Sequence, residues 1–211
     1  MPERAYVALG DSFTAGTGCL PGESWADLLA EAIGCGDPAT RRAYVNLAFD
    51  GATTVDVLAA LDRAVLLRPD LVTVVCGAND VLGSTRPDLD GLAVRLEAVF
   101  AGLAALRPRP LVLTATYPTA WGFIGLGPRT SARVSSGIEF VNDAIRRLAA
   151  EHGAHLVEVS GHPGLNDSRN FAADGLHPSP LGHRRAARGF AAELRAAGFA
   201  IETEDEIAWS K

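Results

Sequence analysis

Three short segments of the chain carry side chains that together could catalyse acyl transfer. They contain Ser12, Asn79, and the pair Asp174 and His177. A serine hydroxyl is a weak nucleophile, so it needs a general base within hydrogen-bonding reach. His177 can accept the hydroxyl proton and return it to a leaving group, and one turn could bring Asp174 to the other ring nitrogen. These residue types and spacings predict a catalytic triad of Ser12, Asp174 and His177.

The same reaction needs donors for the oxyanion of a tetrahedral intermediate. Suitable donors are the backbone N–H groups of Ser12 and Gly51 and the side-chain amide of Asn79. Glycine also lets the backbone approach a ligand closely, because it has no Cβ. The sequence contains no HExxH or CxxC spacing that would indicate a metal site. We therefore expect an oxyanion hole of Ser12, Gly51 and Asn79, with no metal and no cofactor.

Apolar runs of strand length alternate with helix-period segments along the whole chain. This pattern is typical of a parallel sheet with helices on both faces. It predicts a three-layer α/β/α fold with a five-stranded parallel sheet, doubly wound as in flavodoxin. The expected strands are 5–9, 44–48, 71–76, 111–116 and 155–159, and the expected helices are 24–34, 54–67, 89–106, 135–152 and 179–198.

The candidate residues follow these expected strands. Ser12 comes after the first strand, Gly51 after the second and Asn79 after the third, while His177 precedes the last helix. Sites in open parallel sheets lie outside the carboxyl ends of the strands. The topology therefore predicts that these residues meet at one edge of the sheet.

Four blocks of the sequence resemble those of the SGNH/GDSL hydrolase family. Gly10-Asp11-Ser12-Phe13 is similar to the block that carries the nucleophile, with phenylalanine in place of leucine. Gly51 matches the second-block glycine, Gly77-Ala78-Asn79-Asp80 resembles the G-x-N-D block, and Asp174-Gly175-Leu176-His177-Pro178 resembles the D-x-x-H block. The resemblance implies a three-layer α/β fold, a Ser-Asp-His triad and hydrolysis of esters or thioesters without a metal.

An apolar, glycine-rich segment from Trp121 to Gly127 follows the fourth expected strand. It could be a loop folded onto the core, or an acyl-binding wall or mobile lid. On the second interpretation, Trp121, Phe123 and Ile124 contact the substrate.

Length and composition favour one globular domain, residues 1–211. Hydrophobic residues make up 48% of the 211, and the formal net charge of -6 argues against a nucleic-acid partner. No apolar run approaches the roughly 18 residues that span a bilayer. The N-terminus lacks signal-peptide features, so we expect a cytoplasmic protein, or a secreted one if a signal peptide has been removed. The expected partner is a small ester or lipid substrate, and the oligomeric state is left open.

For several other residues we expect a structural and not a catalytic role. Cys76 and Trp25 are expected in the core, and a disulfide between Cys19 and Cys35 is left open because an odd number of cysteines argues against a disulfide scaffold. Asp11 is expected to organise its loop, and Asp80 to hold its loop by hydrogen bonds to the backbone. For the other histidines we expect His183 on the surface of the last helix or packed behind the site, and His152, His155 and His162 in surface loops.

Three other functions are compatible with parts of this pattern. A flavodoxin-like phosphate or nucleotide binder would use the glycine- and hydroxyl-rich segment 12–18, but no Walker lysine follows it. An acyltransferase or thioesterase would use the same triad, and the acceptor that reaches the site would decide between them. An intact triad argues against a non-catalytic carbohydrate-binding descendant of the fold.

Overall fold

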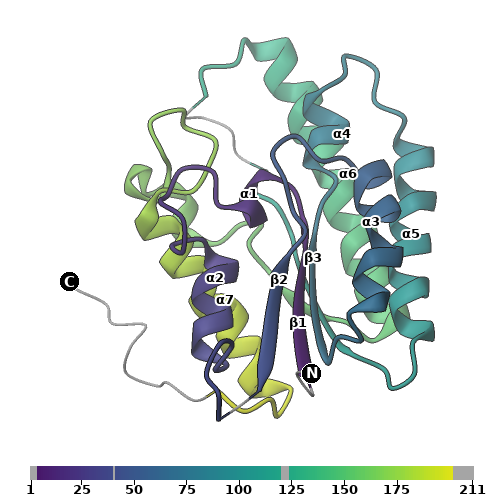
Figure 1. Ribbon diagram of the computed structural model, residues 1–211. Coiled ribbons are helices and arrows are strands. Elements are labelled where there is room, and N and C mark those ends of the chain that lie inside the picture. Colours follow the sequence, from purple (N-terminus) through teal and green to yellow (C-terminus); the bar gives the residue numbers. More distant parts are fainter. Residues whose placement is uncertain (1–3, 40, 120–123, 202–211) are drawn as a thin grey trace.

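A five-stranded parallel sheet forms the centre of the protein (Figure 1). The computed structural model describes residues 4–39, 41–119 and 124–201. The strand order, β2-β1-β3-β4-β5, is that of flavodoxin-like folds. This confirms the predicted fold class. The strands are β1 (Arg4–Gly10), β2 (Arg42–Asn46), β3 (Leu71–Val75), β4 (Leu111–Ala115) and β5 (His155–Val157).

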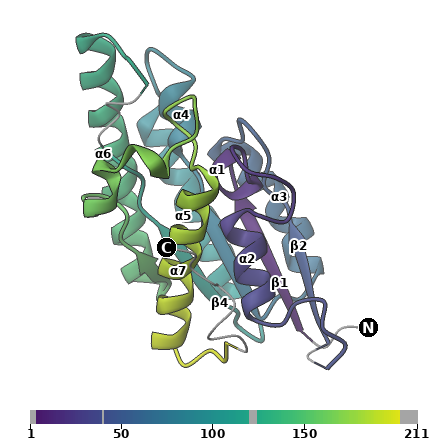
Figure 2. The same ribbon diagram turned by 90° about the vertical axis from the view of Figure 1, so that its left-hand side faces the viewer.

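Helices cover both faces of this sheet, as Figures 1 and 2 show. On one face, α2 (Trp25–Ala32) packs against α7 (Pro180–Ala196). The other face carries the helices α3 (Thr54–Leu66), α5 (Leu89–Ala105) and α6 (Pro128–His152). Two short helices, α1 (Ser12–Ala15) and α4 (Ala78–Leu82), follow β1 and β3 directly.

The core lies on both sides of the central strands. Every residue of β3 is buried, as its nearly continuous β-branched sequence predicts. Trp25 is also buried and stacks on Phe190 of α7, with ring centroids 4.0 Å apart. Burial of Trp25 and of Cys76 confirms that both belong to the core. Cys19 and Cys35 are free thiols and form no disulfide.

The starts of the helices follow from local hydrogen bonding. Ser24 caps α2 in a reciprocal capping box with Asp27. Ser179 caps α7, and Pro180 occupies its first turn. The prediction was wrong for α6, which begins at Pro128 and not at Ser135. Its first buried residue is Val134, so the first turns are exposed and carry no apolar periodicity.

Two 3₁₀ turns, η1 (Pro163–Asn166) and η2 (Ser168–Asn170), lie in the connection from β5 to α7. No helix among the described residues combines the length and apolar character that crossing a membrane requires.

Candidate active site

Ser12 lies at a sharp strand-to-helix turn at the carboxyl end of β1. Asp11 is the N-cap of α1, and its side chain accepts a 3.0 Å hydrogen bond from the backbone N–H of Phe13. The N–H of Asp11 itself donates to the carbonyl of Val75 at the end of β3. These bonds confirm that Asp11 organises the loop, and they leave Ser12 7% exposed at the edge of the sheet.

The loop before α7 brings an acid and an imidazole together. One carboxylate oxygen of Asp174 accepts hydrogen bonds from the backbone N–H groups of Leu176 (2.9 Å) and His177 (3.0 Å), which closes a tight turn. The other oxygen lies 2.5 Å from Nδ1 of His177. Gly18, in the loop after α1, approaches the loop that carries Asp174 and His177 so closely that a Cβ at position 18 would collide with the carbonyl oxygen of Pro178.

A continuous hydrogen-bonded chain runs from Asp174 through His177 to Ser12. Nε2 of His177 lies 2.9 Å from Oγ of Ser12, although 165 positions separate the two residues in the sequence. Burial acts to raise the pKa of Asp174, but hydrogen bonds from His177 and the backbone hold that pKa below its ordinary value. Asp174 is therefore ionised at neutral pH. An ionised partner at Nδ1 favours the tautomer in which Nε2 can accept the Ser12 proton.

The other predicted donors lie in loops that follow neighbouring strands. Gly51 is exposed and has a φ of 80°, a left-handed conformation that favours glycine. The side-chain amide of Asn79, at the start of α4, donates a 3.0 Å hydrogen bond to the carbonyl of Ala52. This bond ties the loop after β2 to the loop after β3, so the two predicted donors belong to one hydrogen-bonded unit.

Asp80 reinforces the same connection. Its carboxylate accepts hydrogen bonds from the backbone N–H and the hydroxyl of Thr54 at 2.9 and 2.7 Å. Arg95 donates to the Thr54 hydroxyl at 2.8 Å and lies 3.4 Å from Asp80. The prediction that Asp80 has a structural role is confirmed. Its hydrogen bonds hold Thr54, at the start of α3, and not its own loop.

A buried network that the sequence did not predict lies beneath Ser12. The hydroxyl of Tyr117 donates a 2.7 Å hydrogen bond to Asp11. Asn142 of α6 binds both the N–H and the carbonyl of Tyr117, at 2.7 and 2.9 Å. Burial raises the pKa of Asp11 to about 7, while hydrogen bonds from Tyr117 and Phe13 act in the opposite direction. Tyr117 lies just after the carboxyl end of β4, and that position is the sequence feature that could have predicted its place near the site.

The remaining histidines correct several predictions. His183 is fully buried, so the helix-surface alternative is wrong and the alternative of packing behind the site is correct. Its Nδ1 accepts a hydrogen bond from the backbone N–H of Trp25. Burial lowers its pKa. His152 ends α6 and His155 begins β5, so neither is a surface-loop residue. Only His162 of these is exposed in a loop, as predicted.

Metal-binding potential lies elsewhere. Within the described ranges, one group of side chains could hold a metal ion, namely Glu97, Glu151 and His152. Arg147 already lies 3.6 Å from Glu97 and 2.7 Å from Glu151. Two residues of the group, Glu151 and His152, belong to the last turn of α6. The group therefore lies at the amino-terminal ends of the strands, opposite the end that carries Ser12 (Figure 1).

The predicted substrate-binding segment is only partly described. Trp121 and Phe123 lie outside the described residues, so their contact with substrate stays a prediction. Ile124 is half-buried and packs against the hydrophobic core.

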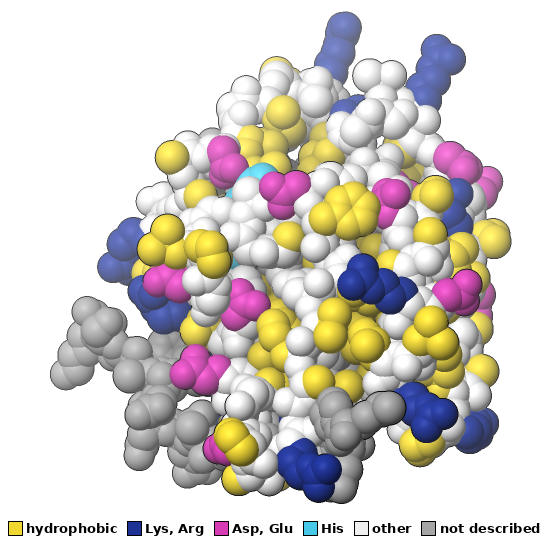
Figure 3. All heavy atoms as spheres, in the orientation of Figure 1, with side chains coloured by type: hydrophobic (Ala, Val, Ile, Leu, Met, Phe, Trp, Pro, Cys, Tyr) yellow, Lys and Arg dark blue, Asp and Glu magenta, His cyan; other side chains and the backbone are white. Residues whose placement is uncertain are grey.

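The surface around this end of the sheet is mixed in character. In Figure 3, basic side chains are scattered among acidic and hydrophobic ones and form no continuous patch on the face shown. Its upper end, where Figure 1 places the carboxyl ends of the strands, is hollowed and lined partly by hydrophobic side chains.

The parallel sheet with helices on both faces, together with the family match, defines an α/β protein of the hydrolase class. The chain belongs to the GDSL-like lipase/acylhydrolase family, whose model matches residues 8–185. This finding confirms the resemblance seen in the four sequence blocks.

Three similar proteins have names that fit this family. A lipase from Streptomyces rimosus is 23% identical over 221 residues, covering 85% of this chain and 82% of the relative. A solved α/β hydrolase enzyme from the metagenome of Lake Arreo is 26% identical, with a TM-score of 0.68 over 92% of this chain and 95% of that one. The lipase/acylhydrolase from Enterococcus faecalis has the same fold, with 24% identity and a TM-score of 0.71 over 95% of this chain and 99% of that one.

Proposed function

We propose that this protein is a carboxylic-ester hydrolase in which Ser12 is the nucleophile, His177 the general base and acid, and Asp174 the residue that orients the imidazole. The observation that carries the proposal is the pair of contacts at His177: 2.9 Å from Nε2 to Ser12 and 2.5 Å from Nδ1 to Asp174. Both lie within the range in which a base can take a proton from a nucleophile.

The reaction runs in two halves. Oγ of Ser12 attacks the ester carbonyl carbon while Nε2 of His177 takes the hydroxyl proton. The tetrahedral intermediate collapses, the carbon–oxygen bond to the alcohol breaks, and His177 gives its proton to the departing alkoxide. Water then attacks the acyl-enzyme on Ser12 while His177 takes a proton from it, the bond between the acyl carbon and Oγ of Ser12 breaks, His177 returns the proton to Oγ, and the acid is released.

The oxyanion formed in each half needs fixed donors. The N–H groups of Ser12 and Gly51 and the amide of Asn79 supply them in this proposal. An amide group carries two N–H donors, so Asn79 can keep its bond to Ala52 with one and bind the oxyanion with the other. Because the bond to Ala52 is already formed in the free protein, little reorganisation is needed at the moment of reaction.

Hydrolysis of p-nitrophenyl acetate, butyrate and octanoate tests the proposal. We expect activity that is unchanged by EDTA and that falls on the order of 10⁶-fold in Ser12→Ala, as for other serine triads. Ser136→Ala, an exposed serine on α6, is the matched control and should retain full activity. Mass spectrometry after treatment with a fluorophosphonate should place the adduct on Ser12. Full activity of Ser12→Ala, or loss of activity with EDTA, would contradict the mechanism.

A further inference from the structure

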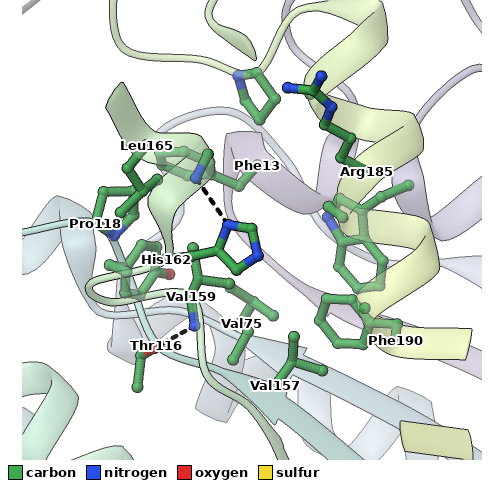
Figure 4. A pocket seen from close by; sticks show the side chains of 18 of the residues that line it. Phe13, Val75, Thr116, Pro118, Val157, Val159, His162, Leu165, Arg185 and Phe190 are labelled. Carbon is green, nitrogen blue, oxygen red and sulfur yellow. Dashed lines mark hydrogen bonds between the residues drawn. The ribbon is translucent and has the colours of Figure 1, made fainter. Parts of the chain in front are cut away.

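A cavity of about 480 Å³ lies beneath α7, on the β4–β5 side of the sheet. This volume falls within the ~300–1,000 Å³ typical of small-molecule sites. Figure 4 shows side chains from the sheet, from the connection before α7 and from α7 itself pointing toward a common space. Its deep wall is apolar and contains Val75, Val157 and Phe190, all of which are buried.

The cavity begins one side chain away from the candidate triad. Its lining includes Phe13, which follows Ser12, and Leu176 and Pro178, which flank His177. The ring of Phe13 forms the boundary, with its centroid 5.8 Å from the His177 ring and 5.5 Å from the Tyr117 ring. The residues that hold the triad and the residues that wall the cavity are therefore direct neighbours in the sequence.

Sheet topology places most of the cavity on the far side of Ser12 from Gly51. Gly51 follows β2 and Ser12 follows β1, whereas the strand residues of the cavity come from the end of β3 and mainly from β4 and β5. With the strand order β2-β1-β3-β4-β5, Gly51 lies toward one side of the row of strands and the cavity toward the other, with Ser12 between them. An ester whose carbonyl oxygen faces the donors can therefore direct its acyl chain toward the cavity.

Two of the charged groups at the cavity, Glu158 and Arg185, already have protein partners. Glu158 accepts hydrogen bonds from Arg146 at 2.9 Å and from Thr116 at 2.6 Å. Arg185 lies 3.1 Å from Asp167 and donates to the side chain of Asn170 at 2.5 Å. A polar ligand would have to break these bonds, whereas an aliphatic chain would only displace water from apolar walls.

We propose that this cavity binds the aliphatic acyl chain of the substrate, entered past the ring of Phe13, so that the preferred substrates are esters of medium-chain fatty acids. The proposal rests on the proposed esterase function and names its substrate class. Acetate is too short to reach beyond Phe13, but octanoate would bury most of its chain there.

A substitution that fills the cavity should lower activity on the octanoate ester and leave activity on the acetate ester unchanged. Ala186 lines the cavity from α7, and Ala196, exposed on the same helix, does not. We expect Ala186→Phe to lower kcat/KM for p-nitrophenyl octanoate about tenfold or more relative to the acetate, because a hydrophobic pocket discriminates by at least this factor when methylene contacts are lost. Ala196→Phe should leave the ratio unchanged. An unchanged octanoate-to-acetate ratio in Ala186→Phe would overturn the proposal.

Calorimetry of octanoate binding tests the cavity without requiring turnover. Octanoate should bind Ser12→Ala protein, and binding should weaken about tenfold or more when Ala186→Phe is added but not when Ala196→Phe is added. This result would hold even if Ser12 were not the nucleophile, so failure of the esterase mechanism and failure of the cavity proposal remain distinguishable. In the wild-type enzyme, octanoate should compete with p-nitrophenyl acetate; non-competitive inhibition would mean a separate ligand site and would contradict the acyl-chain assignment.

Discussion

The hydroxyl of Tyr117 donates a 2.7 Å hydrogen bond to the carboxylate of Asp11, directly beneath the turn that carries Ser12. Both side chains are buried. The bond links the end of β4 to the N-cap of α1 and so helps to fix the position of the candidate nucleophile.

Replacing Tyr117 with phenylalanine should therefore lower both stability and activity. Loss of the hydroxyl leaves a buried acceptor without its partner, which costs about 1–3 kcal/mol. We expect a lower urea midpoint together with a reduced kcat, because the turn at Ser12 loses a support. Tyr44→Phe is the matched control, since the Tyr44 hydroxyl also donates to a carboxylate, Asp27, at 2.9 Å. If both variants kept wild-type kcat, the Tyr117 bond would have no positioning role.

Asp11 should make the stability of the protein depend on pH. Burial raises the pKa of this carboxyl from 3.8 to about 7 in the folded protein. Between these pH values the folded state holds a proton that the unfolded chain has released, so the free energy of unfolding decreases as pH rises from about 4 to about 7. At roughly 1.4 kcal/mol per unit of pKa, the decrease is on the order of 4 kcal/mol.

Urea unfolding of wild type and Asp11→Asn at pH 5, 6, 7 and 8 measures this dependence. The asparagine variant cannot ionise and should show a flatter profile between pH 5 and 7 than wild type. Identical slopes in the two proteins would show that Asp11 does not titrate in this range.

The fold and much of the site could be predicted from local patterns. The apolar runs define the strands, and the three-residue spacing of Asp174 and His177 is one at which a single turn brings the two side chains into contact. Of the two positions expected for His183, the helix surface is wrong and packing behind the site is correct, and the sequence could have distinguished them: with Ala187, Phe190 and Leu194, His183 shares the buried face of α7. Because histidine is polar, a search for apolar residues at helical spacing does not include His183.

Other features depend on contacts that no local pattern encodes. Tyr117 and Asp11 are 106 positions apart, and periodicity places strands without pairing their side chains. The cavity beneath α7 likewise depends on how the connection from β5 packs, because its walls come from segments far apart in the sequence. Tertiary packing, and not propensity, determines such features.

Asn79→Ala tests the proposed oxyanion hole. Loss of one such donor should lower kcat by roughly 10²–10³-fold with little change in KM, because the interaction strengthens only in the transition state. Asp80→Asn provides the comparison: it weakens the bonds to Thr54 and should lower the urea midpoint, with a much smaller effect on kcat. Equal losses of kcat in both variants would indicate that Asn79 acts only by holding its loop.

Asp174→Asn tests the role of the acid in the triad. Asparagine can donate to Nδ1 of His177 and thereby favour the tautomer whose Nε2 carries the proton, which leaves Ser12 without a base. We expect kcat to fall on the order of 10⁴-fold with the structure retained, as for the equivalent change in serine proteases. Asp143→Asn, on the exposed face of α6 beside Arg146, should leave kcat unchanged. A loss of less than tenfold in Asp174→Asn would mean that a different group orients His177, and the 2.5 Å contact would then have only a structural role.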